Sequence, residues 1–442
     1  MNMSLSFHKV VAFAAILAST VTDASYYSLP IKRSTYGIYW KVPRVLEQNH
    51  GPHGQAVLGA SFPHLRLLDI TSTFSRMSIN ARGNNINEGI NLADGDDEDV
   101  DAWFISLCTT TVGVGNPPLM MTATVDNTWS TFFVPSANCS NNPNEFESCK
   151  IHPMYNSSLS STYQPHLDPA SVLYVGLHTK GNISQDSIHV AGMEIKDQLF
   201  EEATMWHPDV GTADHLFDNA LGLSLFPSHS SFGQNDFMAT SPFQNMIEQK
   251  LLDRNMFSLR VGRTDQEAGE LVLGGLPQEL KGIDIVEVPL DHSRNSSDYP
   301  WDYWTMNGCS EDTTPVLETP QIAVISSPWP WMGLPTDVVK KIHKMIGIQY
   351  TFHWIQCDKR SELPNWTITF GPHGQSITLT PWDYLIEVYD KVFKQLKCMS
   401  AFFSLEQYGD KGFIILGQPL LNGLHSVFDA DKKSISFANR PL

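Results

Sequence analysis

Residues 122–129 read TATVDNTW, and residues 322–329 read IAVISSPW. Each run is rich in apolar and β-branched residues and ends in a short turn before a tryptophan, which is typical of a strand that enters a tight loop. The two runs match position by position, with Asp126 in the first and Ser326 in the second. The chain therefore looks duplicated, and only one copy of the loop carries an acid.

A second repeated feature follows each loop at a similar distance along the chain. Residues 220–222 (ALG) follow the first loop, and residues 415–417 (ILG) follow the second. A repeat of this length suits two homologous lobes and not a short-period solenoid. We therefore expect two lobes that face each other.

The order of these motifs resembles the pepsin-like aspartic peptidases (family A1), in which each of two lobes contributes one Asp-Thr-Gly loop to a shared catalytic pair. The resemblance runs from about Trp103 to Leu442 and implies a mainly β, bilobal acid protease fold, with two homologous β lobes and a cleft between them. The matching segments are 112–118 (VGVGNPP), 132–136 (FFVPS), 160–163 (SSTY), 217–223 (FDNALGL), 269–275 (GELVLGG) and 428–438 (FDADKKSISFA).

The chain divides into four regions on this interpretation. Residues 1–24 combine a basic start, an apolar run and a small-residue end, which predicts a cleaved secretory signal and not a membrane span; a buried N-terminal helix is the alternative. Residues 25–101 form a basic segment that ends in an acidic run and resembles a removable prosegment, notably at 29–33 (LPIKR). Residues 102–278 and 279–442 are the N-terminal and C-terminal peptidase lobes.

Several features fit passage through the secretory pathway, with the protein secreted, extracellular or in the lysosomal lumen. Glycosylation sequons of the form Asn-X-Ser/Thr occur at Asn138, Asn156, Asn182, Asn295 and Asn365. The six cysteines are expected to pair in an oxidising compartment.

The resemblance implies two disulfides, Cys139 with Cys149 and Cys357 with Cys398. It does not account for Cys108 and Cys309. An intrachain bridge between these two, two free thiols, or a bridge to another chain all stay open.

The formal net charge of −18 over 442 residues disfavours nucleic acid and anionic membranes as partners, because both would be repelled. We expect no cofactor and no metal. The sequence GPHGQ occurs at both 51–55 and 371–375, but His53 and His373 are best explained by shared turn chemistry.

The catalytic chemistry of the family depends on two neighbouring carboxylates that share one proton, so that one activates water while the other protonates the scissile carbonyl. The resemblance implies that Asp126 is the retained first-lobe acid. Ser326 stands where the second acid belongs, and a serine of ordinary acidity is neither base nor acid near pH 4. The sequence therefore predicts a broken catalytic pair.

The residues beside the two acid positions also depart from the family pattern. Asn127 and Ser327 replace paired threonines whose hydroxyls tie the loops together, and Thr128 and Pro328 replace glycines. These changes predict a damaged supporting shell around the single acid. Asn127 and Ser327 are candidate binding residues.

Three aromatic residues complete the candidate binding site. Trp129 and Trp329 occupy positions where the family has a small hydroxyl, so they either form an aromatic floor to the cleft or turn into the lobe cores. Tyr174 matches the tyrosine of the family's flap, a hairpin that covers the cleft, and the residues after it predict a stiffer flap tip.

Three functions follow from these observations. The first is a secreted, non-catalytic pepsin-fold protein that binds a peptide, glycan or protein in the cleft between the lobes. The second is an active aspartic endopeptidase that works at acid pH with an unorthodox partner for Asp126. The third is a structural or storage glycoprotein. The sequence makes no prediction of the oligomeric state.

Overall fold

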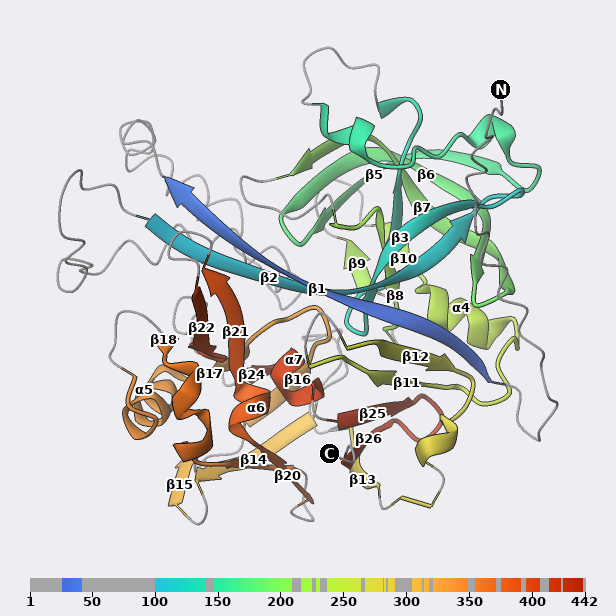
Figure 1. The fold of residues 1–442 in the computed structure, drawn as a ribbon. Coiled ribbons are helices and arrows are strands. Elements are labelled where there is room, and N and C mark those ends of the chain that lie inside the picture. The colour runs from blue at the N-terminus through green and yellow to red at the C-terminus, as the bar shows by residue number, and fades with distance from the viewer. Residues whose placement is uncertain are drawn as a thin grey trace, which may run out of the picture.

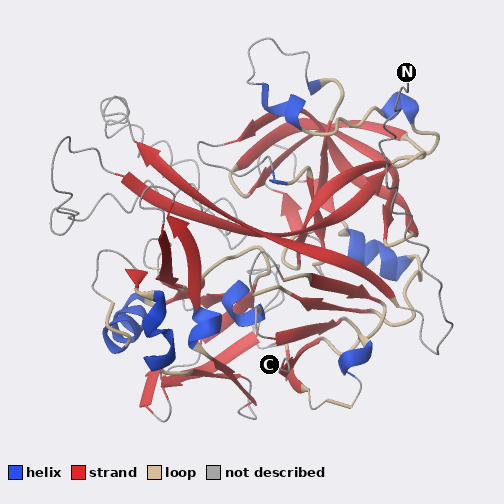
Figure 2. Ribbon diagram, viewed as in Figure 1, coloured by secondary structure: helices blue, strands red, loops and turns tan. Residues whose placement is uncertain are grey.

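The computed structural model of the chain describes residues 26–41, 100–139, 147–208, 216–224, 228–230, 237–263, 267–280, 282–283, 285–290, 304–311, 314–317, 321–348, 354–370, 375–390, 395–405, 413–422 and 424–439. Strands dominate these residues, and the helices are short (Figure 2). The structure confirms the predicted mainly β fold of two lobes. The signal segment 1–24, most of the acidic run, Asn295, His53 and His373 lie outside the described residues.

Two long strands join the lobes at the centre of the molecule. β1 (Tyr27–Lys41) pairs with β12 (Gly269–Leu273) through its first five residues and with β2 (Val100–Val114) from Lys32 onward. Figure 1 shows β1 and β2 crossing between the green strands of the first lobe and the orange strands of the second. The prosegment-like region therefore supplies a central strand of the fold.

The largest sheet has thirteen strands and contains strands from both lobes. Besides β1, β2 and β12 it comprises β3 (Leu119–Asp126), β4 (Phe132–Pro135), β5 (Gln164–Tyr174), β6 (Leu177–Val190), β7 (Met193–Pro208), β8 (Asn219–Gly222), β11 (Met256–Arg260), β13 (Val286–Pro289), β25 (Leu424–Asp429) and β26 (Ser434–Asn439). The first lobe also carries β9 (Ser228–Ser230), β10 (Phe237–Ala239) and α4 (Pro242–Glu248).

The second lobe is built on a sheet of eight strands and a smaller sheet of three. The eight are β14 (Trp304–Glu311), β15 (Thr314–Leu317), β16 (Gln321–Ile325), β17 (Met332–Leu334), β19 (Trp366–Phe370), β20 (Gln375–Leu379), β23 (Phe402–Ser404) and β24 (Phe413–Leu416). The three are β18 (Trp354–Ile355), β21 (Leu385–Asp390) and β22 (Gln395–Ser400). The α-helices are α5 (Thr336–Met345), α6 (Pro381–Tyr384) and α7 (Gln418–Leu421).

The duplication inferred from sequence is visible in the strand pairing. β3 runs parallel to β8, and β16 runs parallel to β24 in the corresponding part of the second lobe. Gly222 and Gly417 lie where the chain passes behind each loop, since a Cβ atom would lie 2.4 Å from the Trp129 carbonyl oxygen at the first and 2.1 Å from that of Trp329 at the second. Only glycine permits this close approach, which explains why both ALG and ILG end in it.

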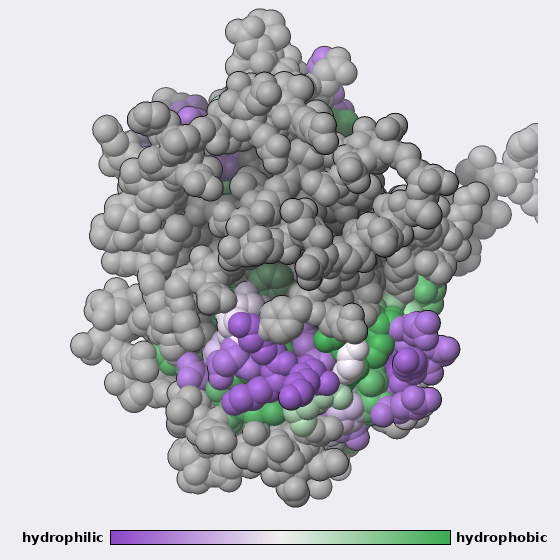
Figure 3. All heavy atoms as spheres, turned by 90° about the vertical axis from the view of Figure 1, so that its left-hand side faces the viewer, coloured by the Kyte–Doolittle hydropathy of each residue, from purple (hydrophilic) through white to green (hydrophobic). Residues whose placement is uncertain are grey.

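Helix α5 covers one side of the second lobe. Its buried residues are Val338, Val339, Ile342 and His343, and its opposite face carries lysines. Figure 3 views the molecule from the side on which α5 lies. On this side, hydrophilic residues cover much of the described surface, and hydrophobic residues show between them. This amphipathic pattern is what places the helix against the lobe.

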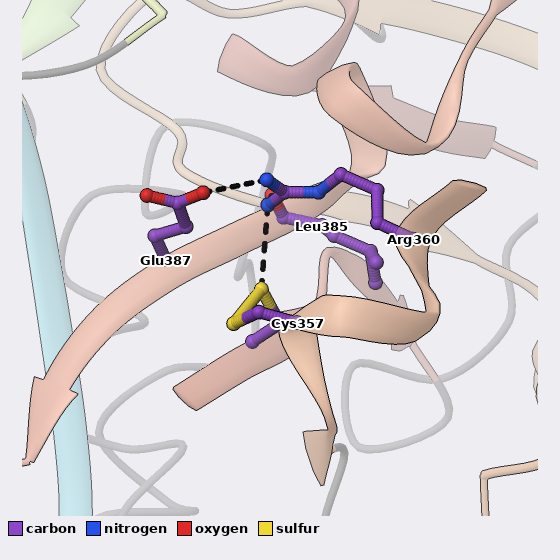
Figure 4. Close-up of a disulfide and its surroundings, with 5 residues drawn as sticks. Cys357, Arg360, Leu385 and Glu387 are labelled. Atoms are coloured by element: carbon purple, nitrogen blue, oxygen red, sulfur yellow. Dashed lines mark hydrogen bonds and ion pairs between the residues drawn. A yellow bond between two sulfur atoms is a disulfide. The ribbon is translucent and has the colours of Figure 1, made fainter. Parts of the chain in front are cut away.

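Two disulfides, Cys139–Cys149 and Cys357–Cys398, are present, and they are the two pairs that the resemblance implies. The second joins the 3-10 helix η7 (Cys357–Glu362) to β22, and Figure 4 shows Arg360 reaching from η7 over this bridge. Arg360 donates to Glu387 Oε1 at 2.5 Å and to Cys398 Sγ at 3.3 Å. The disulfide and the buried guanidinium together fix this corner of the second lobe.

The described residues do not test a disulfide between the remaining cysteines, Cys108 and Cys309. Cys108 is buried on β2, and Gln418 Nε2 lies 3.9 Å from its Sγ. The side chain of Cys309 lies outside the described residues. A bridge between them therefore stays a prediction.

Strand β1 is held by alternate buried side chains and by one buried arginine. Leu29 and Ile31 face the core, each worth about 2 kcal/mol of burial. Arg33 Nη1 donates to the carbonyls of Gly262 and Arg263, both at 2.8 Å, and to Asn422 Oδ1 at 3.2 Å. Arg33 thereby connects the strand to the first lobe and to the second.

Replacing Arg33 with alanine should lower the free energy of unfolding by about 3 kcal/mol, because two buried acceptors and one partly buried acceptor lose their donor. The neighbouring Lys32 is exposed, so Lys32→Ala should change it by less than about 0.5 kcal/mol. Denaturant unfolding of both variants measures the difference. Equal stabilities would show that the contacts of Arg33 do not hold β1 in place.

Candidate active site

The two loops that resemble catalytic loops lie at equivalent ends of β3 and β16. Asp126 is the last residue of β3, and its carbonyl accepts from Leu223 N at 2.8 Å. Ser326 directly follows β16, and its N–H donates to the Leu416 carbonyl at 3.0 Å. Both side chains are completely buried. The fold therefore places the acid and the serine at matching positions on the two lobes.

The carboxylate of Asp126 is held by three donors. Thr128 donates to Oδ1 twice, from its N–H at 2.8 Å and from its hydroxyl at 2.7 Å. The Tyr174 hydroxyl donates to Oδ2 at 3.1 Å, and the same hydroxyl lies 2.6 Å from Thr124 Oγ1. Thr128, which stands where the family has a glycine, thus supplies the hydroxyl that Trp129 cannot.

Burial raises the pKa of Asp126 from 3.8 to about 6, because the charged form loses its solvation. The hydrogen bonds from Thr128 and Tyr174 act in the opposite direction and are the smaller effect. None of the groups that shift this pKa is a second carboxyl. Asp126 therefore titrates as a single buried acid, and within the described residues no partner shares its proton.

Ser326 brings no compensating chemistry to the second position. Its Oγ is buried and makes no hydrogen bond within the described part of the chain. A hydroxyl without a neighbouring base is not activated as a nucleophile. Among the described residues, Ser326 Oγ therefore has no base that could activate it.

The two loops are tied to each other by Asn127 and Ser327, whose side chains reach across the molecule. Asn127 Nδ2 donates to the Ile325 carbonyl at 2.8 Å, and Asn127 Oδ1 accepts from Ser327 N at 2.7 Å. Ser327 Oγ donates to the Val125 carbonyl at 2.8 Å and accepts from Asn127 N at 3.1 Å. We call these four bonds the interlobe latch. The damaged support predicted from the sequence is therefore wrong. The amide of Asn127 and the hydroxyl of Ser327 connect the two loops, as the two threonine hydroxyls of the family would.

The tryptophans Trp129 and Trp329 are buried in one apolar cluster that contains residues of both lobes. The Trp129 ring lies 4.9 Å from the ring of Tyr174, and its Nε1 donates to the Thr131 carbonyl. The sequence left open whether the indoles form the cleft floor or lobe core. They lie at the junction of the lobes, and their contact with a ligand stays a prediction.

The flap predicted from Tyr174 is present as the hairpin of β5 and β6. Tyr174 pairs with Leu177 across a two-residue turn, in which Val175 and Gly176 both have positive φ, 48° and 77°. Positive φ at both turn residues gives a two-residue turn whose twist matches that of the flanking strands. Tyr174 therefore comes to Asp126 at the end of a tight, regular hairpin.

Glu201 on β7 is a buried ionisable residue that no sequence motif indicated. It is fully buried and accepts from Thr179 Oγ1 at 2.9 Å, and burial raises its pKa from 4.5 to about 8. The neighbouring Glu202 accepts from Ser136 and Ser184. Consecutive residues of a strand point to opposite faces. Two adjacent acids in a strand therefore place one carboxyl on each face, and this pattern in the sequence was the signal that at least one of them is buried.

The described residues contain no cluster of three or more His, Cys, Asp or Glu side chains that could hold a metal ion. Asp126 and Glu202 accept hydrogen bonds from hydroxyl groups, as does Oε2 of Glu201, whereas Oε1 of Glu201 is buried and makes no hydrogen bond within the described residues. The Asp126 carboxyl accepts from the neutral donors Thr128 and Tyr174, and the Tyr174 ring packs against that of Trp129.

Comparisons with known proteins agree on one family. The family model of eukaryotic aspartyl proteases matches residues 108–440. Probable vacuolar protease A of Trichophyton verrucosum is 31% identical over 340 residues, covering 74% of this chain and 77% of that protein. Cathepsin D of Gallus gallus is 30% identical over 337 residues, covering 74% and 79%, and cathepsin D of Dictyostelium discoideum is 29% identical over 331 residues, covering 74% and 82%.

Stability should fall as the pH rises through the pKa of Asp126. Folding raises this pKa, so the stabilisation is fully present below about pH 4 and is lost as the pH passes about 6. The change from 3.8 to about 6 corresponds to about 3 kcal/mol. Between about pH 3 and 7, the wild type should therefore lose about 3 kcal/mol relative to Asp126→Asn, measured by denaturant unfolding. Asp168→Asn, at an exposed acid, is the control, and parallel curves for Asp126→Asn and the wild type would contradict the assignment.

Removing either side of the interlobe latch should destabilise the protein. Asn127→Ala and Ser327→Ala should each cost about 2 kcal/mol, because each leaves buried backbone groups without a partner. The double variant should cost clearly less than the sum, since both changes break the same network. Unfolding free energies of the three variants test this, and strict additivity would show that the two side chains act independently.

Proposed function

Because the chain belongs to the eukaryotic aspartyl protease family, we propose that it is a non-catalytic member whose interlobe cleft binds a peptide, a glycan or a protein. One observation carries the proposal. Ser326 occupies the position that corresponds to Asp126, and its buried hydroxyl has neither a base nor any hydrogen-bond partner among the described residues. The reaction needs two carboxyls held together as acid and base, and at the two matching loop positions the chain has one carboxyl, that of Asp126.

The retained features support binding more than hydrolysis. The interlobe latch keeps the two loops in register, and the flap still covers the site. These are the parts of the fold that position a ligand, whereas the replaced residue is the one that moves protons. A chain that keeps the first set and lacks the second fits a binding protein.

Peptides are the favoured class of ligand. Several of the relatives are named as proteases, which act on polypeptide chains. The cleft of this fold accommodates an extended peptide between its lobes. Glycans and whole proteins are the remaining candidates.

An active aspartic endopeptidase is the second candidate, and the condition of Asp126 favours it. The carboxyl is retained, is held by three donors, and has a pKa of about 6. A hydrolytic mechanism would need a second acid from outside the described residues or from a partner chain. A structural or storage glycoprotein that binds no ligand is the third candidate.

The cellular setting that we propose is a lumenal or extracellular compartment. The relatives include proteins named as vacuolar, the two disulfides suit an oxidising environment, and four sequon asparagines, Asn138, Asn156, Asn182 and Asn365, are exposed. Among the described residues, no helix is long and apolar enough to cross a membrane. Residues 1–24 would be removed as a signal, and the lobes would span 102–278 and 279–442.

Purified, glycosylated protein should not cleave a diverse peptide library between about pH 3 and 7. Loss of one catalytic group typically lowers the rate by about 10⁴ to 10⁶, so cleavage by the wild type should equal the background of Asp126→Ala. Mass spectrometry of the library, with and without pepstatin, measures this.

Cleavage that is present in the wild type, absent in Asp126→Ala and inhibited by pepstatin would replace the binding proposal with an active endopeptidase. The variant Ser326→Asp provides the matched control, because it returns a carboxyl to the second loop and shows whether the missing acid is what limits activity.

A further inference from the structure

One tryptophan of the second lobe, Trp382 in α6, has its side chain on the surface. It is 62% exposed, whereas the other tryptophans whose exposure the structure describes are buried or half-buried. The guanidinium carbon of Arg360 lies 4.2 Å from the centre of the indole ring, a cation–π contact that covers one face of the ring. The exposed area of Trp382 therefore includes the opposite face.

The surroundings of this indole hold it in a fixed orientation. Arg360 is buried and donates to Glu387 Oε1 at 2.5 Å and to the Leu385 carbonyl at 3.2 Å. Helix α6 is capped by Asp383 Oδ2, which accepts from the N–H and the hydroxyl of Thr380 at 2.8 and 2.7 Å. A ring that is already held in place loses little conformational entropy when a ligand stacks on it.

A glycosylation sequon, Asn365-Trp366-Thr367, lies beside the start of α6. Asn365 is exposed, whereas Trp366 is completely buried and pairs with Leu379 between β19 and β20. Because residues of an antiparallel pair advance in opposite directions, the next position of this register places Asn365 opposite Thr380. The sequon asparagine is therefore a cross-strand neighbour of the residue that caps α6.

A second contact joins the same two segments. The Tyr384 hydroxyl, at the end of α6, donates to the Pro364 carbonyl at 2.7 Å. The 3-10 helix η7, which carries Arg360, ends at residue 362, two residues before Pro364. Asn365 and Trp382 thus lie on one exposed corner of the second lobe, with Arg360 beneath the indole.

The chemistry of this corner suits a sugar that is attached to it. A pyranose ring presents a face of C–H groups that stacks on an indole, while its hydroxyl groups stay in water at the rim. A sugar linked to Asn365 has a high effective concentration at the neighbouring ring, so even a weak stacking contact is populated. A free oligosaccharide lacks this advantage.

We propose that Trp382 is the docking surface for an N-linked glycan on Asn365, whose first sugars stack on the indole face opposite Arg360. The inference rests on the proposed lumenal setting, in which sequons are glycosylated, and it is independent of what the cleft binds. The docked glycan covers the corner of the second lobe that holds the Cys357–Cys398 disulfide.

Hydroxyl-radical footprinting of the full, glycosylated chain tests the contact. Asn365→Gln should raise the oxidation of Trp382 roughly two- to fivefold, because the open face of the ring returns to solvent. Asn156→Gln is the matched control, since it removes another exposed sequon, in the first lobe, and should leave the oxidation of Trp382 unchanged. Mass spectrometry of the oxidised peptides measures both. Equal oxidation of Trp382 in Asn365→Gln and in the glycosylated wild type would overturn the proposal.

A double-variant cycle shows whether the glycan acts through this ring. Removal of the Asn365 glycan should lower the denaturant midpoint of the wild type but have little effect on Trp382→Ala, because the stacking partner is already gone. Equal shifts in the two backgrounds would overturn the proposal, since they would show that the glycan and the indole act independently.

The occupancy of each sequon, measured by mass spectrometry, separates this inference from the proposed setting. Glycans at other sequons with none at Asn365 would overturn the inference and leave the lumenal setting intact, whereas no glycan at any sequon would count against both. Added chitobiose distinguishes the two sources of sugar. If it protects Trp382 in Asn365→Gln while the attached glycan gives no protection in the wild type, the ring binds an outside sugar and the proposal is overturned.

Discussion

The interlobe latch is the interaction on which the rest of the site depends. Asn127 and Ser327 are 200 residues apart, yet each satisfies a backbone group of the other loop and is satisfied in return. Because all these groups are buried, breaking one bond leaves another group unpaired. The latch thereby sets the relative position of Asp126 and Ser326, and with it the space that the flap fills.

That space is closed by two different kinds of contact. Aromatic and aliphatic packing joins the flap tip to both lobes, while one carboxylate accepts hydrogen bonds from Thr128 and Tyr174. The apolar contacts supply most of the stabilisation, since they bury large side chains. The hydrogen bonds fix which tyrosine atom meets which oxygen, so the closed arrangement is specific as well as stable.

Two buried carboxyls make the folded state more stable at acidic than at neutral pH. Burial raises the pKa of Asp126 to about 6 and that of Glu201 to about 8, so both are protonated in the folded protein under mildly acidic conditions. Neither then carries the cost of a buried charge. The net charge of −18 acts in the same direction, because protonation reduces self-repulsion.

The sequence by itself predicted the two lobes and has one acid, Asp126, at the two matching loop positions, and its resemblance to the family implied the two disulfides. The lobes follow from matched strand and loop motifs, and the structure shows why each repeat ends in a glycine, at 222 and 417. Only the tertiary structure decided that Asn127 and Ser327 restore the connection between the loops, that Thr128 supplies the missing hydroxyl, that Glu201 faces inward, and that Arg33 joins β1 to both lobes. Apart from Thr128, which lies two residues from its partner Asp126, each of these depends on the direction of a side chain toward a partner that is remote in sequence. Residue types and spacings do not specify that direction.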